Sequence, residues 1–441
     1  MPGSRPRWML HVQAVFWRFL MGIGMSLHKM ARPRPSRPAF HRDVDATVSP
    51  IKGKFRIHFY VPKDYKRYKK LKGNKKYPCV INFHGGGFVL GSAHDDARWC
   101  NIVAKEVGAV VVSVAYRLAP EYPFPTAVED GADAILWLAQ NAEELMLDSD
   151  RFAVSGFSSG GNMSFTVPLC LQGELFDRTP AGARIIDGRA GSVPNALLQP
   201  PPPVANTTAT ASGSSSRIPL MRQQSRLDRI AMMRQTGASS LSLVSSYKEG
   251  PAVSVMTTAN NRVVKIRGIV SFYPPTDYTI TRAQRRATCA RADQNLPAVF
   301  TELFDDSYLQ PPSLDLAHPW LSPGQAPTRM LEALPDDIVM FCCEWDMLRE
   351  EGEQFSDKLR KDLGKRVHHH TIAGVPHGFD KAPNPLRESP GARQQYLVAC
   401  KELRRMFDMD EDEEDGSDHG DLPCRKHHKS VDMGKLQVSS R

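Results

Sequence analysis

A G-x-S-x-G pentapeptide at residues 156–160 constrains the fold of this chain more than any other feature. It lies between a β-prone run at 152–155 and a run with helical character at 159–172. A serine in so sharp a strand-to-helix turn has a strained backbone and an exposed hydroxyl. Side chains two residues to either side would collide across the turn, so both positions need glycine. The pattern therefore predicts a nucleophile elbow, with Ser158 as the nucleophile.

The segments after Pro50 alternate between strand-like and helix-like patterns. This alternation is typical of a mostly parallel sheet flanked by helices. The first strand, 55–61, alternates in the manner of an edge strand. We predict strands at 55–61, 79–83, 109–115, 152–155, 266–273, 338–343 and 367–372, and helices at 126–141, 159–172 and 393–407.

Composition divides the 441 residues into a globular part and several segments too polar to form a core. The catalytic domain is predicted at 51–177 and 263–407, with an irregular helical excursion at 277–330. A disordered Ser/Pro/Arg-rich insertion is predicted at 178–262. It contains Arg222-Gln223-Gln224-Ser225, which has the spacing of a basophilic kinase site. A disordered tail, acidic and then basic, is predicted at 408–441.

The net charge of +9 does not indicate a nucleic-acid partner. The excess of bases lies outside the predicted core, at residues 1–40 and in the insertion. No zinc-finger spacing or aromatic RNA-binding signature accompanies it. The cysteines are scattered without a C-x-x-C pair, so the sequence requires neither a disulfide nor a metal.

Residues 1–50 are predicted to form an amphipathic N-terminal or cap segment. The apolar run 8–27 is a poor membrane span, because Arg18 would lie at mid-bilayer. It also lacks the cleavage site of a signal peptide. An amphipathic helix leaves three uses open: a lid over the active site, attachment to a membrane surface, or a transit peptide. We favour a lid that doubles as a weak membrane contact.

A second glycine motif, His84-Gly85-Gly86-Gly87-Phe88, follows the predicted strand 79–83. Acyl transfer places negative charge on the carbonyl oxygen, and preorganised backbone N–H groups can stabilise that charge. Glycines allow the backbone to approach the substrate closely. We therefore predict an oxyanion hole formed by Gly85, Gly86 and the amide of Ser159. His84 is interpreted as an anchor of this loop.

A serine nucleophile needs a histidine base oriented by a carboxylate. In an elbow-containing sheet the chain order is serine, acid, histidine. His377 follows the last predicted strand, and Asp346 follows the strand before it. Glu344 and Glu350 are rival acids. The cluster 368–370 is a rival base, but alternation within a strand would place these three histidines on both faces.

These motifs together resemble the hormone-sensitive-lipase-like family of α/β-hydrolases. The resemblance covers residues 50–407 without the insertion, and it rests on 84–88, 116–125, 156–162, 346–349 and 377–379. It implies an eight-stranded α/β-hydrolase fold with a helical cap formed by the residues before 50 and the excursion 277–330. It also implies the triad Ser158, Asp346 and His377 and the oxyanion donors named above. Two positions depart from the family pattern. Phe157 replaces an acidic residue before the nucleophile, and Ala115 replaces an aspartate.

The expected function is therefore serine carboxylic-ester hydrolysis through an acyl-enzyme, without cofactor or metal. The substrate would be a small-molecule or lipid ester. One alternative is a membrane-associated deacetylase or lipase acting on sterol or glyceride esters. Another is a non-catalytic small-molecule receptor, which the presence of His377 disfavours. We expect a cytoplasmic protein, with peripheral contact to a membrane such as the endoplasmic reticulum through residues 8–27.

Overall fold

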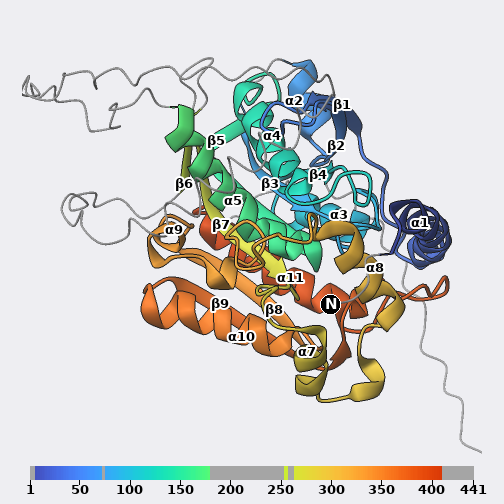
Figure 1. Cartoon of the computed structure of the whole chain (residues 1–441). Helices are drawn as coiled ribbons and strands as arrows, with labels where there is room; N and C mark the ends of the chain where they lie inside the picture. The colour runs from blue at the N-terminus through green and yellow to red at the C-terminus, as the bar shows by residue number, and fades with distance from the viewer. Residues whose placement is uncertain (1–4, 72–74, 179–252, 257–262, 410–441) are drawn as a thin grey trace, which may run out of the picture.

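The computed structural model describes residues 5–71, 75–178, 253–256 and 263–409. Figure 1 shows the chain as one sheet with helices packed on both sides. Most of the predicted insertion lies outside the described residues, as do the motif 222–225 and the tail from residue 410.

The sheet has the order β1-β2-β4-β3-β5-β7-β8-β9, with β6 paired to β7. The strands from β4 to β9 along this path are parallel, whereas β2 is antiparallel to both of its neighbours. The prediction of a mostly parallel sheet flanked by helices is thus confirmed. The strands are β1 Phe40–Asp45, β2 Lys54–Tyr60, β3 Tyr77–Phe83, β4 Val110–Ala115, β5 Leu147–Phe157, β6 Val253–Met256, β7 Val263–Phe272, β8 Asp337–Trp345 and β9 Arg366–Pro376.

Two strands lie where none was predicted. The edge strand is β1 rather than β2, so the sheet begins before the boundary predicted at residue 50. Only Val44 of β1 is buried, so the strand lacks the apolar alternation that reveals a strand in a sequence. The short strand β6 lies inside the predicted insertion and pairs antiparallel with the start of β7.

Helices cover the two faces of the sheet. On one face, Trp99 of α3 (Ala97–Glu106) meets Tyr396 of α11 (Ala392–Met406), with ring centroids 5.4 Å apart. The other face carries α4 (Thr126–Gln140), α5 (Ser159–Arg178) and α10 (Arg349–Asp357). Phe165 of α5 packs edge-on against Phe355 of α10. The short helix α2 (Tyr65–Lys70) lies outside these layers.

The excursion between β7 and β8 consists of short helices. They are α7 (Arg282–Thr288), α8 (Ala298–Tyr308), α9 (Thr328–Glu332) and the 3-10 turns Ala292–Gln294 and Pro323–Gln325. The side chain of Thr281 accepts a hydrogen bond from the amide of Gln284, and the two residues form a capping box at the start of α7.

Helix α1 (Arg7–Met30) lies at the outer edge of the molecule (Figure 1). Its Trp17 packs edge-on against Phe300 of α8, with centroids 4.7 Å apart. The guanidinium of Arg18 points inward and donates to the carbonyls of Val89 and Ala119 at 2.8 Å each. Within the described residues, α1 is the one helix whose length and composition would allow it to cross a membrane.

Candidate active site

The sequence-predicted site residues all lie at the carboxyl ends of neighbouring strands. His84 follows β3 and Ser158 follows β5. Asp346 follows β8, and His377 directly follows β9, which runs four residues further than predicted, to Pro376. Because parallel strands end at the same edge of the sheet, residues far apart in the sequence meet there.

The turn that carries Ser158 has the geometry of a nucleophile elbow. Ser158 has a φ of 53°, in the left-handed region that non-glycine residues rarely adopt. A Cβ on Gly156 would lie 2.0 Å from the carbonyl oxygen of Gly160, and one on Gly160 would lie 1.9 Å from that of Phe83. Only glycine fits at either position, which is the constraint expected from the sequence.

Three predicted side chains form a continuous hydrogen-bonded chain. His377 Nε2 lies 2.8 Å from Ser158 Oγ, and His377 Nδ1 lies 2.6 Å from Asp346 Oδ2. The other carboxylate oxygen of Asp346 accepts from the amide of Leu348 at 2.9 Å. The Asp346 carboxylate can therefore hold the imidazole in the tautomer that accepts a proton from Ser158.

The rival acids and bases have other partners. Glu344 accepts from the amide of Gly374 at 2.6 Å, and the exposed Glu350 accepts from Gln354. His368 lies 3.1 Å from Glu402 of α11. Burial lowers the pKa of His369, and the charge of Glu353 on α10 opposes this shift. Neighbouring histidines of β9 thus face opposite sides of the sheet.

The glycine loop after β3 lies against the nucleophile. A Cβ on Gly85 would be 3.4 Å from the Cβ of Ser158. Gly86 has a φ of 122° and comes so close to the carbonyl of Leu90 that a side chain could not fit. Ser159 begins α5, where the positive end of the helix dipole points toward the elbow. The glycine loop and the start of α5 therefore meet beside Ser158.

His84 occupies the anchoring position that the sequence suggests. It is buried, its Nδ1 lies 2.8 Å from the carbonyl of Gly85, and its ring stacks on Tyr116. Tyr116 also donates its hydroxyl to the His84 carbonyl at 2.7 Å. Burial lowers the pKa of His84, so this ring remains neutral. Tyr116 thus holds the glycine loop in position through both its ring and its hydroxyl group.

The chain matches the α/β-hydrolase fold family over residues 80–233 and 251–381. The chain belongs to this family. It is 27% identical to Lipase 2 of Moraxella sp. (strain TA144) over 328 residues, which cover 73% of this chain and 58% of the lipase. It is 37% identical to human hormone-sensitive lipase over 122 residues, 27% of this chain and 11% of the lipase.

The likeness extends to solved structures of this hydrolase family. An esterase of Pyrobaculum calidifontis is 25% identical with a TM-score of 0.57, over 89% of this chain and 93% of that one. The hormone-sensitive-lipase-like resemblance inferred from the motifs is confirmed. In length, the chain spans just over half of Lipase 2 and a smaller share of human hormone-sensitive lipase.

The two departures from the family pattern have different surroundings in this chain. Ala115 ends β4, and the next residue but one, Arg117, forms a buried ion pair with Asp130 of α4 at 2.6 Å. Phe157 is buried, stacks on Phe272, and has Lys381 Nζ 3.8 Å from its ring centroid. A cation therefore lies over the ring that replaces the usual acid.

Lys381 belongs to a buried ionic cluster that the sequence reasoning missed. Its ammonium lies 3.0 Å from Asp96 and 2.8 Å from Asp380. Burial opposes its charge, but the two carboxylates outweigh burial and raise the pKa of Lys381 well above its ordinary value. Asp380 also accepts at 2.5 Å from Tyr273, whose ring packs edge-on against His377. The Asp-Lys pair directly after the His377-Gly-Phe motif was the signal available in the sequence.

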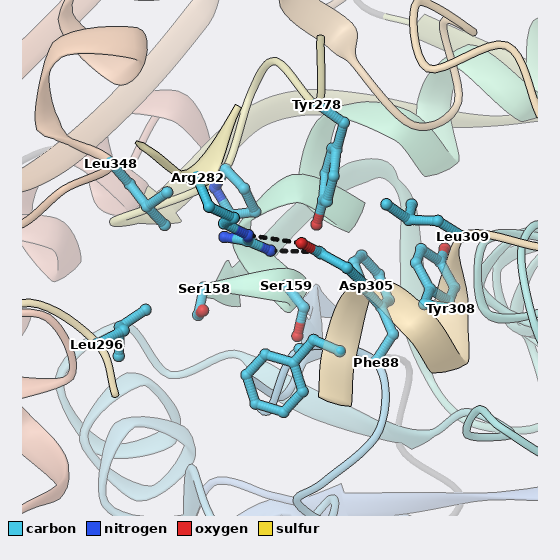
Figure 2. A pocket seen from close by; sticks show the side chains of 13 residues that line it. Phe88, Ser158, Ser159, Tyr278, Arg282, Leu296, Asp305, Tyr308, Leu309 and Leu348 are labelled. Atoms are coloured by element: carbon cyan, nitrogen blue, oxygen red, sulfur yellow. Dashed lines mark hydrogen bonds and ion pairs between the residues drawn. The ribbon is translucent and has the colours of Figure 1, made fainter. Parts of the chain in front are cut away.

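A pocket opens directly beside the nucleophile (Figure 2). It is a cavity of about 30 Å³. Ser158 and Ser159 line it from the core, and the cap faces them with aromatic, leucine and charged side chains. Its lining is completed by Gly87, Phe88, Pro275, Tyr278, Arg282, Leu296, Phe304, Asp305, Tyr308, Leu309 and Leu348. No α1 residue is part of this lining, and the helix contacts the surroundings of the pocket through Phe300 of α8 and the carbonyl of Val89.

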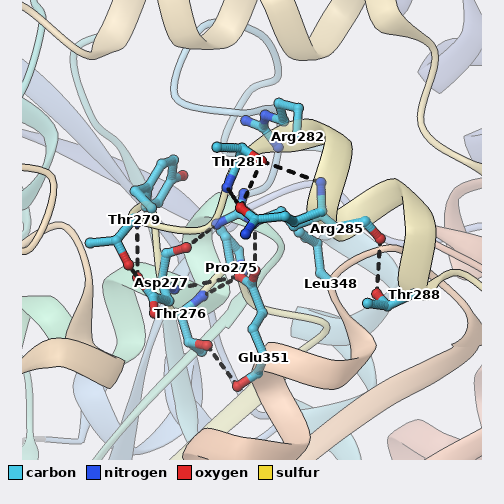
Figure 3. Close-up of polar contacts among 12 residues, drawn as sticks. Pro275, Thr276, Asp277, Thr279, Thr281, Arg282, Arg285, Thr288, Leu348 and Glu351 are labelled. Atoms are coloured by element: carbon cyan, nitrogen blue, oxygen red, sulfur yellow. Dashed lines mark hydrogen bonds and ion pairs between the residues drawn. The ribbon is translucent and has the colours of Figure 1, made fainter.

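The cap is joined to the helix that follows Asp346 (Figure 3). Arg285 of α7 forms a buried ion pair with Glu351 of α10 at 2.6 Å. Glu351 also accepts from the amide of Thr276 at 2.8 Å. Burial raises the pKa of Glu351 to about 7, although Arg285 opposes the shift. This pair joins α7 to the helix that begins three residues after Asp346.

Proposed function

We propose that this chain is a serine carboxylic-ester hydrolase that forms an acyl-enzyme on Ser158. The observation that carries the proposal is the hydrogen-bonded chain from Ser158 through His377 to Asp346. The esterase and lipase names of its relatives support the same reaction class.

In the first step, His377 Nε2 takes the proton of Ser158 as the hydroxyl oxygen attacks the ester carbonyl. Asp346 stabilises the resulting imidazolium, and the amides of Gly85, Gly86 and Ser159 bind the oxyanion. His377 then donates its proton to the leaving alcohol. In the second step, water loses a proton to His377 and attacks the acyl carbonyl; the bond from the carbonyl carbon to Ser158 Oγ then breaks, His377 returns the proton to Oγ, and the acid leaves. Side chains of this protein carry each proton, so the proposal requires no cofactor or metal.

A non-catalytic receptor on the same fold is the competing function. Covalent labelling separates the two: a fluorescent p-nitrophenyl phosphonate should modify the wild-type protein at Ser158, with release of one equivalent of p-nitrophenol. Ser158→Ala should remain unlabelled while retaining its thermal stability. A folded wild-type protein that neither reacts with phosphonates nor hydrolyses any short p-nitrophenyl ester would contradict the proposal.

We further propose that the enzyme works on the cytoplasmic side of a membrane, in peripheral contact through α1. The exposed positions of this helix between Trp8 and Met30 carry no charge. They hold Gly22, Ser26 and nine large apolar side chains, namely Trp8, Val12, Val15, Phe16, Phe19, Leu20, Ile23, Leu27 and Met30. The nine recur every three or four residues, so they form one stripe along the helix. We call these nine side chains the α1 stripe.

Charge complementarity favours lipid as the partner of the α1 stripe. Arg18, near the middle of the helix, forms an ion pair with Glu121 at 2.7 Å and leaves the stripe neutral. Other bases lie in the first and last turns of the helix, at Arg7 and Lys29, and just after it, at Arg34. Residues 1–40 contain no acid. A neutral apolar stripe between basic ends suits an anionic bilayer interface.

Vesicle flotation tests this contact. Wild-type protein should float with vesicles that contain anionic lipid, and less so as salt rises. The triple variant Phe16→Ser/Phe19→Ser/Ile23→Ser should remain at the bottom of the gradient. Leu71→Ser, which changes an exposed apolar residue directly after α2, is the matched control and should float. If wild type and triple variant float equally, the contact does not exist.

A further inference from the structure

A charged pair lies across the pocket from Ser158 (Figure 2). Arg282 of α7 and Asp305 of α8 both line the cavity, and two parallel hydrogen bonds of 2.8 and 2.5 Å join the guanidinium to the carboxylate. About a quarter of each side chain is exposed. A fork of this kind holds both side chains in one geometry. It therefore connects two cap helices directly across the space in front of Ser158.

The location of His377 indicates which half of an ester enters this pocket. The leaving alcohol must lie beside His377 Nε2, because that atom supplies its proton. His377 is not among the residues that line the pocket, whereas Gly87, Phe88 and Ser159, on the oxyanion side, are. The group that projects into the pocket is therefore the acyl chain.

The helix that carries Arg282, α7, is held in place by further polar contacts. One turn after Arg282, Arg285 is buried against Glu351, and its guanidinium also donates to the carbonyl of Asp277 (Figure 3). Arg286 donates at 2.9 Å to the carbonyl of Leu296, which itself lines the pocket. These contacts hold α7 in place, so the helix cannot carry Arg282 aside without breaking buried polar contacts.

We infer that the Arg282–Asp305 ion pair closes the acyl pocket and sets the length of acyl chain that Ser158 accepts. The inference rests on the proposed function and deepens it. The cavity of about 30 Å³ has room for roughly two water-sized groups. A longer alkyl chain must press against a guanidinium and a carboxylate or separate them, and either exposes a charged group to hydrocarbon. The substrates are therefore esters with a short acyl group, whatever the size of their alcohol.

The test is the acyl-chain profile with p-nitrophenyl esters from acetate to dodecanoate. Wild-type enzyme should be fastest, by kcat/KM, on acyl chains of about two to four carbons and lose roughly tenfold or more by octanoate. Arg282→Ala/Asp305→Ala removes both charges together. It should raise the octanoate-to-acetate ratio of kcat/KM by at least about tenfold.

Two further variants make the comparison specific. Arg291→Ala/Asp293→Ala deletes an exposed ion pair of the same cap, at 2.7 Å, and should keep the wild-type profile. Asp305→Asn preserves the size of the side chain but removes its charge, and should shift the ratio in the same direction by a smaller factor. Thermal unfolding of each variant shows whether the cap has remained folded.

Wild-type enzyme also provides a test that needs no variant. The rate of inactivation by p-nitrophenyl alkylphosphonates should fall as the alkyl chain lengthens. Equal rates with short and long chains, or an unchanged octanoate-to-acetate ratio in the folded double variant, would overturn the inference and leave the ester hydrolase proposal intact. Failure of every ester and phosphonate to react would instead overturn the proposed function itself.

Discussion

At the scale of single residues, the reactivity of Ser158 depends on which carboxylate orients His377. The carboxylate at 2.6 Å from the imidazole belongs to Asp346. Ser158→Ala and His377→Ala should each reduce ester turnover by roughly 10⁴–10⁶, and Asp346→Asn by about 10⁴ because the wrong tautomer becomes favoured. Glu350→Gln is the control and should leave ester turnover nearly unchanged. A severe loss in Glu350→Gln with a mild one in Asp346→Asn would assign the acid elsewhere.

The buried ammonium of Lys381 leads to a second prediction at this scale. Lys381→Met would leave Asp96 and Asp380 buried without their shared cation. Removing one partner of a buried ionic group costs about 3–5 kcal/mol, measurable by urea unfolding. Lys105→Met, which breaks an exposed pair with Glu106, should cost less than about 1 kcal/mol. Equal stability of the two variants would mean that the cluster contributes no net stability.

Among the structural elements, α1 is held to the body by a histidine as well as by Arg18. His28 Nδ1 lies 3.0 Å from the carbonyl of Ala382, and burial together with Lys381 lowers the pKa of His28 to about 4. The unfolded chain takes up this proton near pH 6.5, so acidification from about 6.5 to about 4 favours unfolding. The stabilisation present above pH 6.5 is at most about 3 kcal/mol.

His28→Gln keeps an amide donor for Ala382 but does not titrate. Its unfolding free energy should therefore fall less steeply than that of wild type between pH 6.5 and 4.5. The comparison must be made against wild type, because burial also lowers the pKa of His58 to about 4. Parallel pH profiles for the two proteins would show that His28 does not couple protonation to the docking of α1.

For the whole molecule, the long segment between α5 and β6 is a connection whose length should matter little. The cost of closing a loop rises by only about 0.6 kcal/mol for each doubling of its length. Replacing residues 195–250 by a short Gly/Ser linker should therefore preserve soluble protein and ester hydrolysis. Removing 195–260 deletes β6 as well and should lower the melting temperature. Insoluble protein from the first deletion would indicate that the segment packs on the domain.

The sequence predicted well what depends on local chemistry. The elbow, the glycine loop and the residues after β8 and β9 were identifiable because each needs a particular residue type at a strand end. The edge strand β1 was not, because its pairing with β2 is set by tertiary contact rather than by its own pattern. The Lys381 cluster and the Arg282–Asp305 pair were missed for a similar reason: each depends on a charged partner that is distant in the chain, Asp96 for Lys381 and Asp305 for Arg282.

The Arg285–Glu351 pair has a consequence for how this enzyme could be redesigned. It joins α7 to the helix after Asp346, so replacing Arg285 to enlarge the pocket would also disturb the acid. Helix α8 is braced differently, against α1, through Trp17 and an ion pair between Arg5 and Asp306 at 2.7 Å. A directed-evolution library should therefore diversify Phe304 and Asp305 and leave Arg285 unchanged. Substrate scope could then change without loss of turnover.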